Sequence, residues 1–226
     1  MKKETEKKLL DLRTKISLYS VDDERARQSF IALLDEALVC EATEVKLGKL
    51  DLFDLCDKSG LRTALEGIAH LNGYQYVSDT KILVKLKSEY SSEFEGRVMR
   101  KDGSLIDEEQ YIRLPNYEST IPEITSEYQE IKVDFGKLTD IIKRAKVHKK
   151  THGKAHRAIV EFNNTWIDLY YFEKFAKILK EHGLNSFYWK EPTRPIVAKQ
   201  DDVFAVILMP MFKVEDPEEY WFIETL

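Results

Sequence analysis

The most regular pattern of apolar and polar positions lies near the C-terminus, in residues 196–211. Two apolar segments, Ile196–Ala198 and Val203–Leu208, flank a polar turn, and this arrangement predicts a β-hairpin. The second segment is apolar throughout, as expected for a strand buried on both faces. Proline cannot donate a sheet hydrogen bond, so the strand should end at Met209-Pro210-Met211. The two methionines indicate either a plain strand end or an adaptable apolar pocket.

The N-terminal part follows a helical period. Apolar residues recur at helical spacing in two stretches of residues 1–43: Leu9, Leu12 and Ile16, then Phe30, Leu33, Leu34, Ala37 and Leu38. Asp22 or Asp23 can cap the second stretch. We expect an N-terminal helical extension over 1–43, which either packs on the rest of the chain or serves as an interaction arm.

Residues 44–126 change to a strand period. After a short helix near Leu50–Cys56, we expect strands at 63–71, 74–77 and 82–86. Asn72-Gly73 between the first two is the strongest short hairpin signal. A second turn pair, Asp102-Gly103, separates two further short strands. The stretch 113–122 carries two prolines, which excludes a central strand and predicts an ordered connection that leads to a domain boundary near residue 126.

Residues 127–226 contain two similar strand–helix units. Strands are expected at 130–133 and 158–162, and helices at about 136–147 and 169–182, each with apolar residues at i, i+3, i+4 and i+7. Strand 186–189 and the C-terminal hairpin follow, and an acidic tail ends the sequence. The repetition predicts an α+β fold with antiparallel curved sheets and both helices on one face.

Composition narrows the functional classes. The chain has 226 residues, a net charge of −5 and two cysteines, and its pI is about 5.7. An acidic protein is not coated with positive charge for nucleic acid, although a local basic face remains possible. Cys40 and Cys56 lie in apolar patterns, which favours core thiols in a reducing compartment. No apolar run is long enough for a membrane span and no signal core follows the N-terminus, so we expect a soluble, cytoplasmic protein.

An enzymatic function is not indicated. His148, His152 and His156 have metal-ligand spacing on a helix, but Gly153 would break that helix and the neighbouring lysines would repel a cation. The sequence has no glycine-rich phosphate loop, nucleophile elbow or HExxH motif. We therefore expect no catalytic residues, no cofactor and no metal.

Three segments, in order, resemble the bacterial sliding-clamp family, the β subunit of DNA polymerase III. Val77–Leu83 resembles the family's ATDGHRL turn, and the preceding Leu61–Gly67 fits the strand before it. Leu114–Pro122 resembles the connector FPDYxxv(l/i)P, and Val206–Met211 resembles the terminal strand VVMPMRL. The match covers roughly residues 44–213. The resemblance implies a clamp-like fold and a processivity factor for DNA replication.

The resemblance also implies a peptide pocket where the middle and last domains of a clamp meet. There, clamps bind a short linear motif of a polymerase or repair protein. Carried over by position, the pocket residues are Ser78, Thr80, Lys81, Ile82, Leu83, Pro115, Ser119, Thr120, Val206, Leu208, Met209, Pro210 and Met211.

A clamp contacts duplex DNA without reading bases, so its helices need only diffuse positive charge. The two helices in residues 127–226 carry basic residues off their apolar stripes, and a basic loop over 149–157 follows the first. The DNA-binding candidates are Lys137, Lys143, Arg144, Lys146, Lys174, Lys177 and Lys180. The alternative is a set of ordinary solvated lysines. If the clamp interpretation holds, one concave, solvent-facing surface should carry Lys137, Lys143, Lys174, Lys177 and Lys180.

The sequence departs from the family in ways that affect function. It has room for about two clamp domains instead of three, and the arginines after the connector tyrosine are Glu118 and Ser119 here. Two functions remain open. The chain is either a DNA clamp assembled from several copies that tethers a polymerase or repair partner, or a stand-alone protein-interaction module that keeps the pocket without encircling DNA. A ring would require a homo-oligomer.

Overall fold

The computed structural model describes residues 28–29, 46–47, 50–88, 90, 94–106, 113–152, 157–212 and 220–225. The predicted helices of residues 1–43 lie outside these residues, except for residues 28 and 29, which are helical. Among the described residues, no helix combines the length and apolarity needed to cross a membrane.

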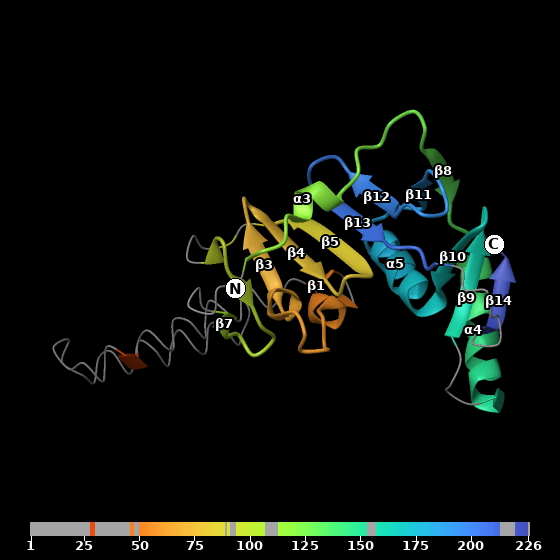
Figure 1. Ribbon diagram of the computed structural model, residues 1–226, viewed down its shortest axis with the longest axis horizontal. Coiled ribbons are helices and arrows are strands. Elements are labelled where there is room, and N and C mark those ends of the chain that lie inside the picture. The colour runs from red at the N-terminus through yellow and green to blue at the C-terminus, as the bar shows by residue number, and fades with distance from the viewer. Residues whose placement is uncertain are drawn as a thin grey trace.

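The largest sheet of the described residues has nine strands (Figure 1). All its neighbouring strands are antiparallel. In spatial order the strands are β7 (Leu105–Ile106), β6 (Val98–Met99), β3 (Ile68–Leu71), β4 (Tyr74–Ser78), β5 (Ile82–Lys87), β13 (Phe204–Leu208), β12 (Ile196–Gln200), β11 (Ser186–Trp189) and β8 (Gln129–Lys132). The pairing of β5 with β13 makes the sheet continuous across residue 126, and the predicted domain boundary there stays a prediction.

Two smaller sheets and the helices complete the fold. One sheet has the order β10 (Thr165–Asp168), β9 (Arg157–Phe162) and β14 (Tyr220–Thr225), and the other pairs β1 (Lys46–Leu47) with β2 (Leu50–Asp51). Within residues 46–225, the described α-helices are α3 (Tyr117–Thr120), α4 (Phe135–His152) and α5 (Leu169–Glu181), and two 3₁₀-helices, η1 (Leu52–Leu55) and η2 (Thr63–Leu65), precede β3. This α+β architecture with predominantly antiparallel sheets agrees with the predicted fold class.

Local signals account for the hairpins. Asn72 and Gly73 both have positive φ, 54° and 77°, as the tight turn between β3 and β4 requires. Asn163 and Asn164, at 44° and 61°, make the same kind of turn between β9 and β10. Asp201, with φ of 43°, turns the predicted C-terminal hairpin. The turns at Asn72-Gly73 and Asp201 therefore lie where the sequence predicts them.

The nine-stranded sheet is buried on both faces around β5 and β13. Alternate residues of β13, such as Val206 and Leu208, join a large core with α4 and α5. The residue between them, Ile207, points the other way and joins a second core beneath α3. Because successive side chains of a strand point to opposite faces, an entirely apolar strand is what two cores require. The prediction that Val203–Leu208 is buried on both faces is confirmed for β13.

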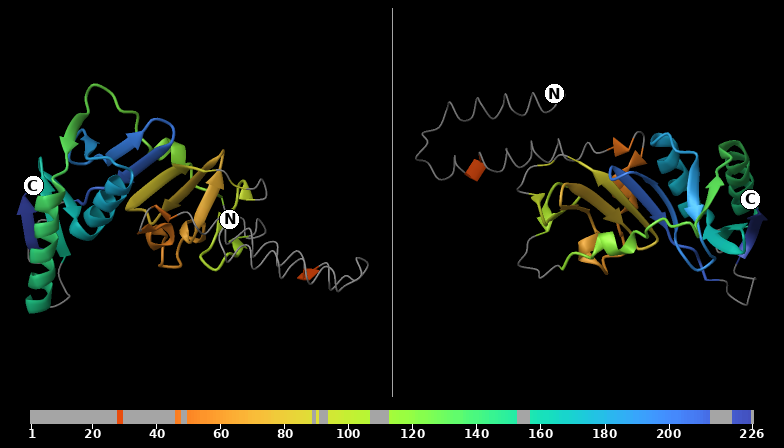
Figure 2. Two further views of the ribbon diagram at one scale, coloured as in Figure 1. Left: turned by 180° about the vertical axis from the view of Figure 1, so that it is seen from behind. Right: turned by 90° about the horizontal axis from the view of Figure 1, so that it is seen from above.

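Helices α4 and α5 lie on the same side of the large sheet. Leu138 and Ile141 of α4 pack in the same core cluster as Phe172 and Phe175 of α5. Asp168 caps α5 by accepting a hydrogen bond from the amide of Tyr170 at 2.9 Å. Figure 2 shows α5 next to the large sheet and α4 further out, beside β14.

Several sequence-based expectations need correction. The first predicted helix continues to His152, so residues 149–152 belong to α4 and not to a basic loop. Residues 165–168 form a strand that the sequence analysis did not predict. Part of the acidic tail forms β14, which pairs with β9 in parallel, an exception to the antiparallel pattern. The helix expected near Leu50–Cys56 is the shorter 3₁₀-helix η1, and η2 takes the start of the strand predicted at 63–71.

Candidate functional site

The candidate site begins at the junction of β5 and β13. Leu208 is paired with Ile82, and Ile207 is paired with Leu83. Just beyond the last pair, the amide of Met209 donates a hydrogen bond to the carbonyl oxygen of Lys81 at 2.8 Å. The 77–83 and 206–211 segments, which are far apart in the sequence, are therefore neighbours in the structure.

The Met209-Pro210-Met211 segment joins two sheets. The amide of Met209 bonds to Lys81 of the large sheet, and the amide of Met211 donates to the carbonyl oxygen of Trp166 in β10 at 2.7 Å. Pro210, which has no amide hydrogen, lies between these two donors. The segment is thus an ordered bridge, held by a backbone hydrogen bond on each side of the proline.

The bridge is also an exposed apolar surface. Met209 is 42% exposed and Phe212 is 85% exposed, whereas the five residues of β13 before them are buried. Met211 is partly buried against Trp166 and Ile159. We call residues 209–212 the strand-end surface. The sequence analysis did not include Phe212 or Trp166, although an apolar residue directly after the predicted pocket strand was a signal for the former.

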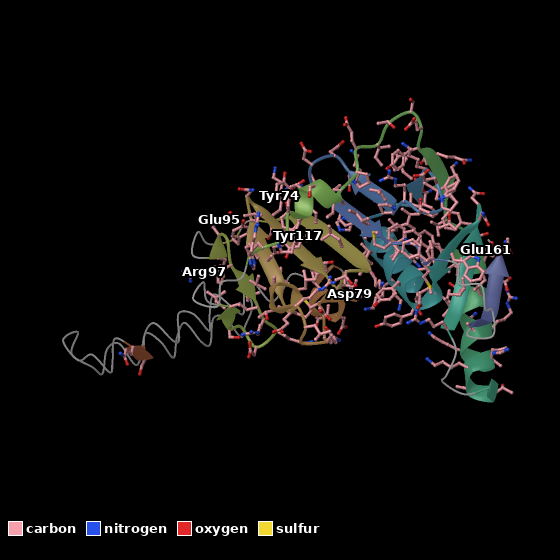
Figure 3. The ribbon with its side chains drawn as sticks, in the orientation of Figure 1. Tyr74, Asp79, Glu95, Arg97, Tyr117 and Glu161 are labelled. Atoms are coloured by element: carbon pink, nitrogen blue, oxygen red, sulfur yellow. The ribbon has the colours of Figure 1, made fainter. Side chains whose placement is uncertain are left out.

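The turn at Asp79 forms one border of this region. Asp79 accepts hydrogen bonds from the amides of Lys81, at 3.0 Å, and Ile82, at 3.1 Å, which fixes the turn. It is also hydrogen-bonded to Tyr171 of α5; burial, together with the negative charge of Asp79 and this bond, raises the pKa of the Tyr171 phenol. Figure 3 shows Asp79 where the strands of residues 68–87 approach α5. Tyr171, which the sequence analysis missed, therefore connects the helix to the turn.

The connector lies on the other face of the sheet. Helix α3 packs through Tyr117, whose ring stacks on Tyr76 at a centroid distance of 4.8 Å. Glu118 accepts a hydrogen bond from the hydroxyl of Tyr76 and forms an ion pair with Lys85 at 2.7 Å. Partial burial opposes ionisation of Glu118, but the bonds from Lys85 and Tyr76 outweigh it and lower its pKa. In Figure 3 Tyr117 lies beside α3, well separated from Asp79.

The structure divides the predicted pocket residues into groups. Ile82, Val206 and Leu208 are buried in the core that faces α4 and α5, whereas Leu83 belongs to the core beneath α3. Ser78 is buried as well. The exposed or partly exposed members are Thr80, Lys81, Met209, Pro210 and Met211 near the bridge, and Pro115, Ser119 and Thr120 on the connector. The side chains of Ile82 and Leu83 thus cannot line one groove, because they point to opposite faces.

The hydroxyl groups on the connector are used locally. Ser119 Oγ donates to the carbonyl oxygen of Asn116 at 2.8 Å, and Thr120 Oγ1 donates to that of Tyr117 at 2.6 Å. The Asn116 side chain accepts a hydrogen bond from the Ser119 amide and so caps α3. These bonds stabilise the short helix itself.

Lys174 is not a solvent-facing residue. It is 9% exposed, and its ammonium group donates a hydrogen bond to the carbonyl oxygen of Asp54 at 2.8 Å. The same nitrogen lies 4.5 Å from the centre of the Tyr170 ring, within the range of a cation–π interaction. The expectation that Lys174 shares a solvent-facing surface with the other candidates is therefore wrong. Lys174 follows the helical spacing of the other basic residues on α5, but its ammonium group contacts Asp54 of η1 and Tyr170 of α5.

Most of the remaining candidates are exposed and have acidic neighbours. Lys143 pairs with Asp140 at 3.4 Å, and Lys146 and Lys177 approach Glu173 at 3.6 and 2.8 Å. Arg144 pairs with Glu224 of β14 at 2.7 Å. Lys137 is exposed in the first turn of α4, and Lys180 is exposed in the last turn of α5. The Lys143–Asp140 pair is exposed at both side chains and exchanges readily with solvent and ions, so it leaves the Lys143 charge accessible to a polyanion.

The basic residues of α4 are more numerous than the candidate list suggested. Because the helix extends to His152, Lys149 and Lys150 are exposed on it as well. We call Lys137, Lys143, Arg144, Lys146, Lys149 and Lys150 the basic face of α4. Asp140 is its one acidic residue. In the part of the chain that the structure describes, no group of three or more His, Cys, Asp or Glu side chains could hold a metal ion.

Comparison with known proteins yields structural neighbours only. No family model matches the chain, and no curated protein matches it either. Two of the solved structures similar to it are of the Helicobacter pylori beta clamp. One, a complex with 3,4-difluorobenzamide, shows 13% identity and a TM-score of 0.43, and covers 72% of this chain and 62% of that one. The other, bound to a DNA ligase peptide, shows 13% identity and a TM-score of 0.40, over 71% and 61%.

A third similar structure is the DNA polymerase III beta subunit of Thermotoga maritima. Its identity to this chain is 16% and its TM-score is 0.45, with coverage of 81% of this chain and 64% of that one. The chain thus spans less than two thirds of the length of each of these three structures.

Proposed function

We propose that this protein is a clamp-like adaptor that binds a short apolar segment of a partner protein at the strand-end surface. The observation that carries the proposal is the exposure of Met209 and Phe212 on a segment fixed at both Met209 and Met211. A surface that is already ordered loses little conformational entropy on binding, which favours affinity. The resemblance of Val77–Leu83 and Val206–Met211 to sliding-clamp motifs supports the same site.

The bound segment should be short and apolar. Lys81, which is exposed and charged, accepts a backbone hydrogen bond from Met209. The Asp79 carboxylate is already hydrogen-bonded to the amide of Lys81 and to Tyr171. We therefore expect a peptide with leucine or phenylalanine anchors for the methionines and Phe212. Few anchors generally supply most of the binding energy at such a site, so single substitutions should have measurable effects.

The test is a titration of a labelled peptide with leucine and phenylalanine anchors against the full chain. Phe212→Ala removes an exposed ring and should leave the fold intact while weakening binding by about 1–2 kcal/mol, roughly 5- to 30-fold. Val203→Ala is a matched control, since Val203 is 47% exposed at the other end of β13. Equal affinities for wild type and Phe212→Ala would contradict the proposed site.

A second candidate function is sequence-independent contact with duplex DNA, which would make the adaptor a tether. The basic face of α4, with its six exposed cations, is the observation that favours it. Such contacts are made to phosphates and weaken steeply as salt rises. Without them, the protein would be a stand-alone protein-interaction module.

Duplex binding is tested by fluorescence anisotropy over a salt series. The triple variant Lys143→Glu, Lys146→Glu, Lys150→Glu should abolish binding at low salt and flatten the salt dependence. A control with the same charge change places glutamate at Lys81, Lys87 and Lys199, which are exposed and lie outside the two helices. If the two variants bind alike, α4 is not the contact surface.

A ring further requires several copies, so the mass of the assembly in solution distinguishes an encircling clamp from a monomeric adaptor.

A further inference from the structure

The last described strand of the chain lies against the basic face of α4. Strand β14 adds in parallel to the edge of β9, with Glu224 opposite Val160 and Thr225 opposite Glu161. It is an edge strand of a three-stranded sheet, and its register shifts between Tyr220 and Phe222. Figures 1 and 2 both show β14 beside α4 and β9. The strand is therefore bonded to the sheet on one side only.

An ion pair connects this strand to α4. Glu224 Oε1 lies 2.7 Å from Arg144 Nη2, and the Glu224 side chain is only 22% exposed. Lys137 and Arg144 are seven residues apart, so they lie on the same flank of the helix. The Glu224 carboxylate thus lies next to Arg144, where a phosphate bound to this flank would lie.

The charges of the two segments are complementary. Strand β14 carries one charged side chain, Glu224, and no lysine or arginine. Helix α4 contains six lysines and arginines and one aspartate. Because β14 pairs with β9, Glu224 is held next to Arg144 at a high effective concentration. It therefore competes with any polyanion that binds the same surface.

We propose that β14 is a reversible acidic cover of the Arg144 flank of α4, held in part by Glu224, and that its release makes this flank available to duplex phosphates. The second half of this inference rests on the proposed DNA contact. The parallel edge position explains how the cover can leave: β14 pairs with β9 at the end of the sheet order, so the pairing of β9 with β10 is kept when β14 detaches. The cover would restrict DNA binding to conditions that detach it.

The cover is tested without DNA by hydrogen exchange of the full chain. Arg144→Gln removes the partner of Glu224, and amides 220–225 should exchange several-fold faster than in wild type. Lys143→Gln is the matched control, because Lys143 pairs with Asp140 on α4 and not with β14. If both variants exchange residues 220–225 at the same rate, charge does not hold the strand and the proposal is overturned.

The release is tested by duplex binding of the full chain at low salt. Glu224→Gln should tighten binding by about two- to fivefold, the scale of one partly exposed ion pair, whereas Asp202→Asn, the same charge change at the exposed β12–β13 turn, should have a smaller effect. Equal tightening by the two variants would overturn the release. Faster exchange in Arg144→Gln with no duplex binding by any variant would refute the proposed DNA contact and leave the cover standing.

Discussion

Helix α5 is enclosed by the protein, whereas α4 is buried along a single stripe. Seven residues of α5 are buried, among them Phe172 and Phe175. The helix packs against β13 of the large sheet and against β9 and β10 of the small one. In α4 the buried residues are Leu138, Ile141 and Ala145, and most of the other positions are exposed. Helix α5 thus joins the two sheets, whereas α4 packs on their outer side against α5 and β14.

The comparison shows that the same charge has different roles on the two helices. A lysine stem can pass along apolar surface and place its ammonium group at a polar partner. On α5, Lys174 does so inside the protein, where it meets the Asp54 carbonyl oxygen. On α4, Lys143 and Lys146 remain at the surface, where their ion pairs contribute little to stability. Lys174 on α5 therefore contributes to packing, whereas Lys143 and Lys146 on α4 stay at the surface.

The largest expected effect is the loss of an aromatic ring from α5. Phe175→Ala should lower the free energy of unfolding by about 3–5 kcal/mol, because the ring is fully buried between the helix and the sheets. Ile142→Ala on α4, where the side chain is only partly buried, should lower it by much less. Guanidinium denaturation of the full chain measures both. Equal losses would remove the distinction between the two helices.

A smaller loss is expected when Lys174 is shortened. Lys174→Ala leaves the Asp54 carbonyl oxygen without its donor and removes the contact with Tyr170, so stability should fall by about 1–3 kcal/mol. Lys177→Ala, three residues on, should change it by about 0.5 kcal/mol or less. Denaturation curves of the two variants decide. If Lys174→Ala leaves the free energy of unfolding unchanged but weakens duplex binding, Lys174 would again be a candidate DNA contact.

The two helices are also connected by charge, and this link should be weak. Glu173 of α5 lies 3.6 Å from Lys146 of α4 and 2.8 Å from Lys177. Glu173→Gln should lower the free energy of unfolding by less than about 1 kcal/mol, and the difference from wild type should shrink in high salt. Denaturation at two salt concentrations provides the measurement. A loss as large as that of Phe175→Ala would mean that charge, and not apolar packing, holds α4 in place.

The smallest effect concerns the end of α5. The His182 ring, directly after α5, stacks on the Phe204 ring at a centroid distance of 3.7 Å. Burial lowers the pKa of His182. As the pH falls below about 6.5, the unfolded chain binds a proton at this position that the folded chain does not, so stability decreases. His182→Gln should therefore lose less stability than wild type between pH 7 and pH 5. Parallel pH dependences of the two proteins would show that the ring is free to ionise in the folded state.

Local signals predicted the elements well, and long-range pairing was beyond them. Asn72-Gly73 and the polar turn at Asp201 are signals for tight turns that depend on neighbouring residues alone, and both turns were correctly placed. Strand β10 was missed because its four residues, Thr165–Asp168, are too few to show a period and end at the cap of α5. Strand β14 was missed because an acidic tail is usually solvated, and only its pairing with β9 makes it a strand.

The candidate site was predicted in outline but not in its details. The resemblance brought together Lys81 and Met209, which the structure joins by a backbone hydrogen bond. Alternation along a strand could have shown that Ile82 and Leu83 point to opposite faces. The burial of Lys174 could not be inferred, because it depends on Asp54, which is 120 positions away in the sequence. A helical period shows which residues share a stripe and not which neighbours cover the rest.

The pairing of β5 with β13 has a consequence for the growing chain on the ribosome. About 120 residues separate these two strands, so β5 is made long before its partner exists. At a synthesis rate of about 5–20 residues per second, the delay is roughly 6–24 seconds. During that time the edge of β5 presents unpaired amides and carbonyls and the apolar residues Ile82, Leu83 and Val84, features of a segment that aggregates. A nascent chain arrested before residue 204 should therefore be a better chaperone substrate than the finished protein.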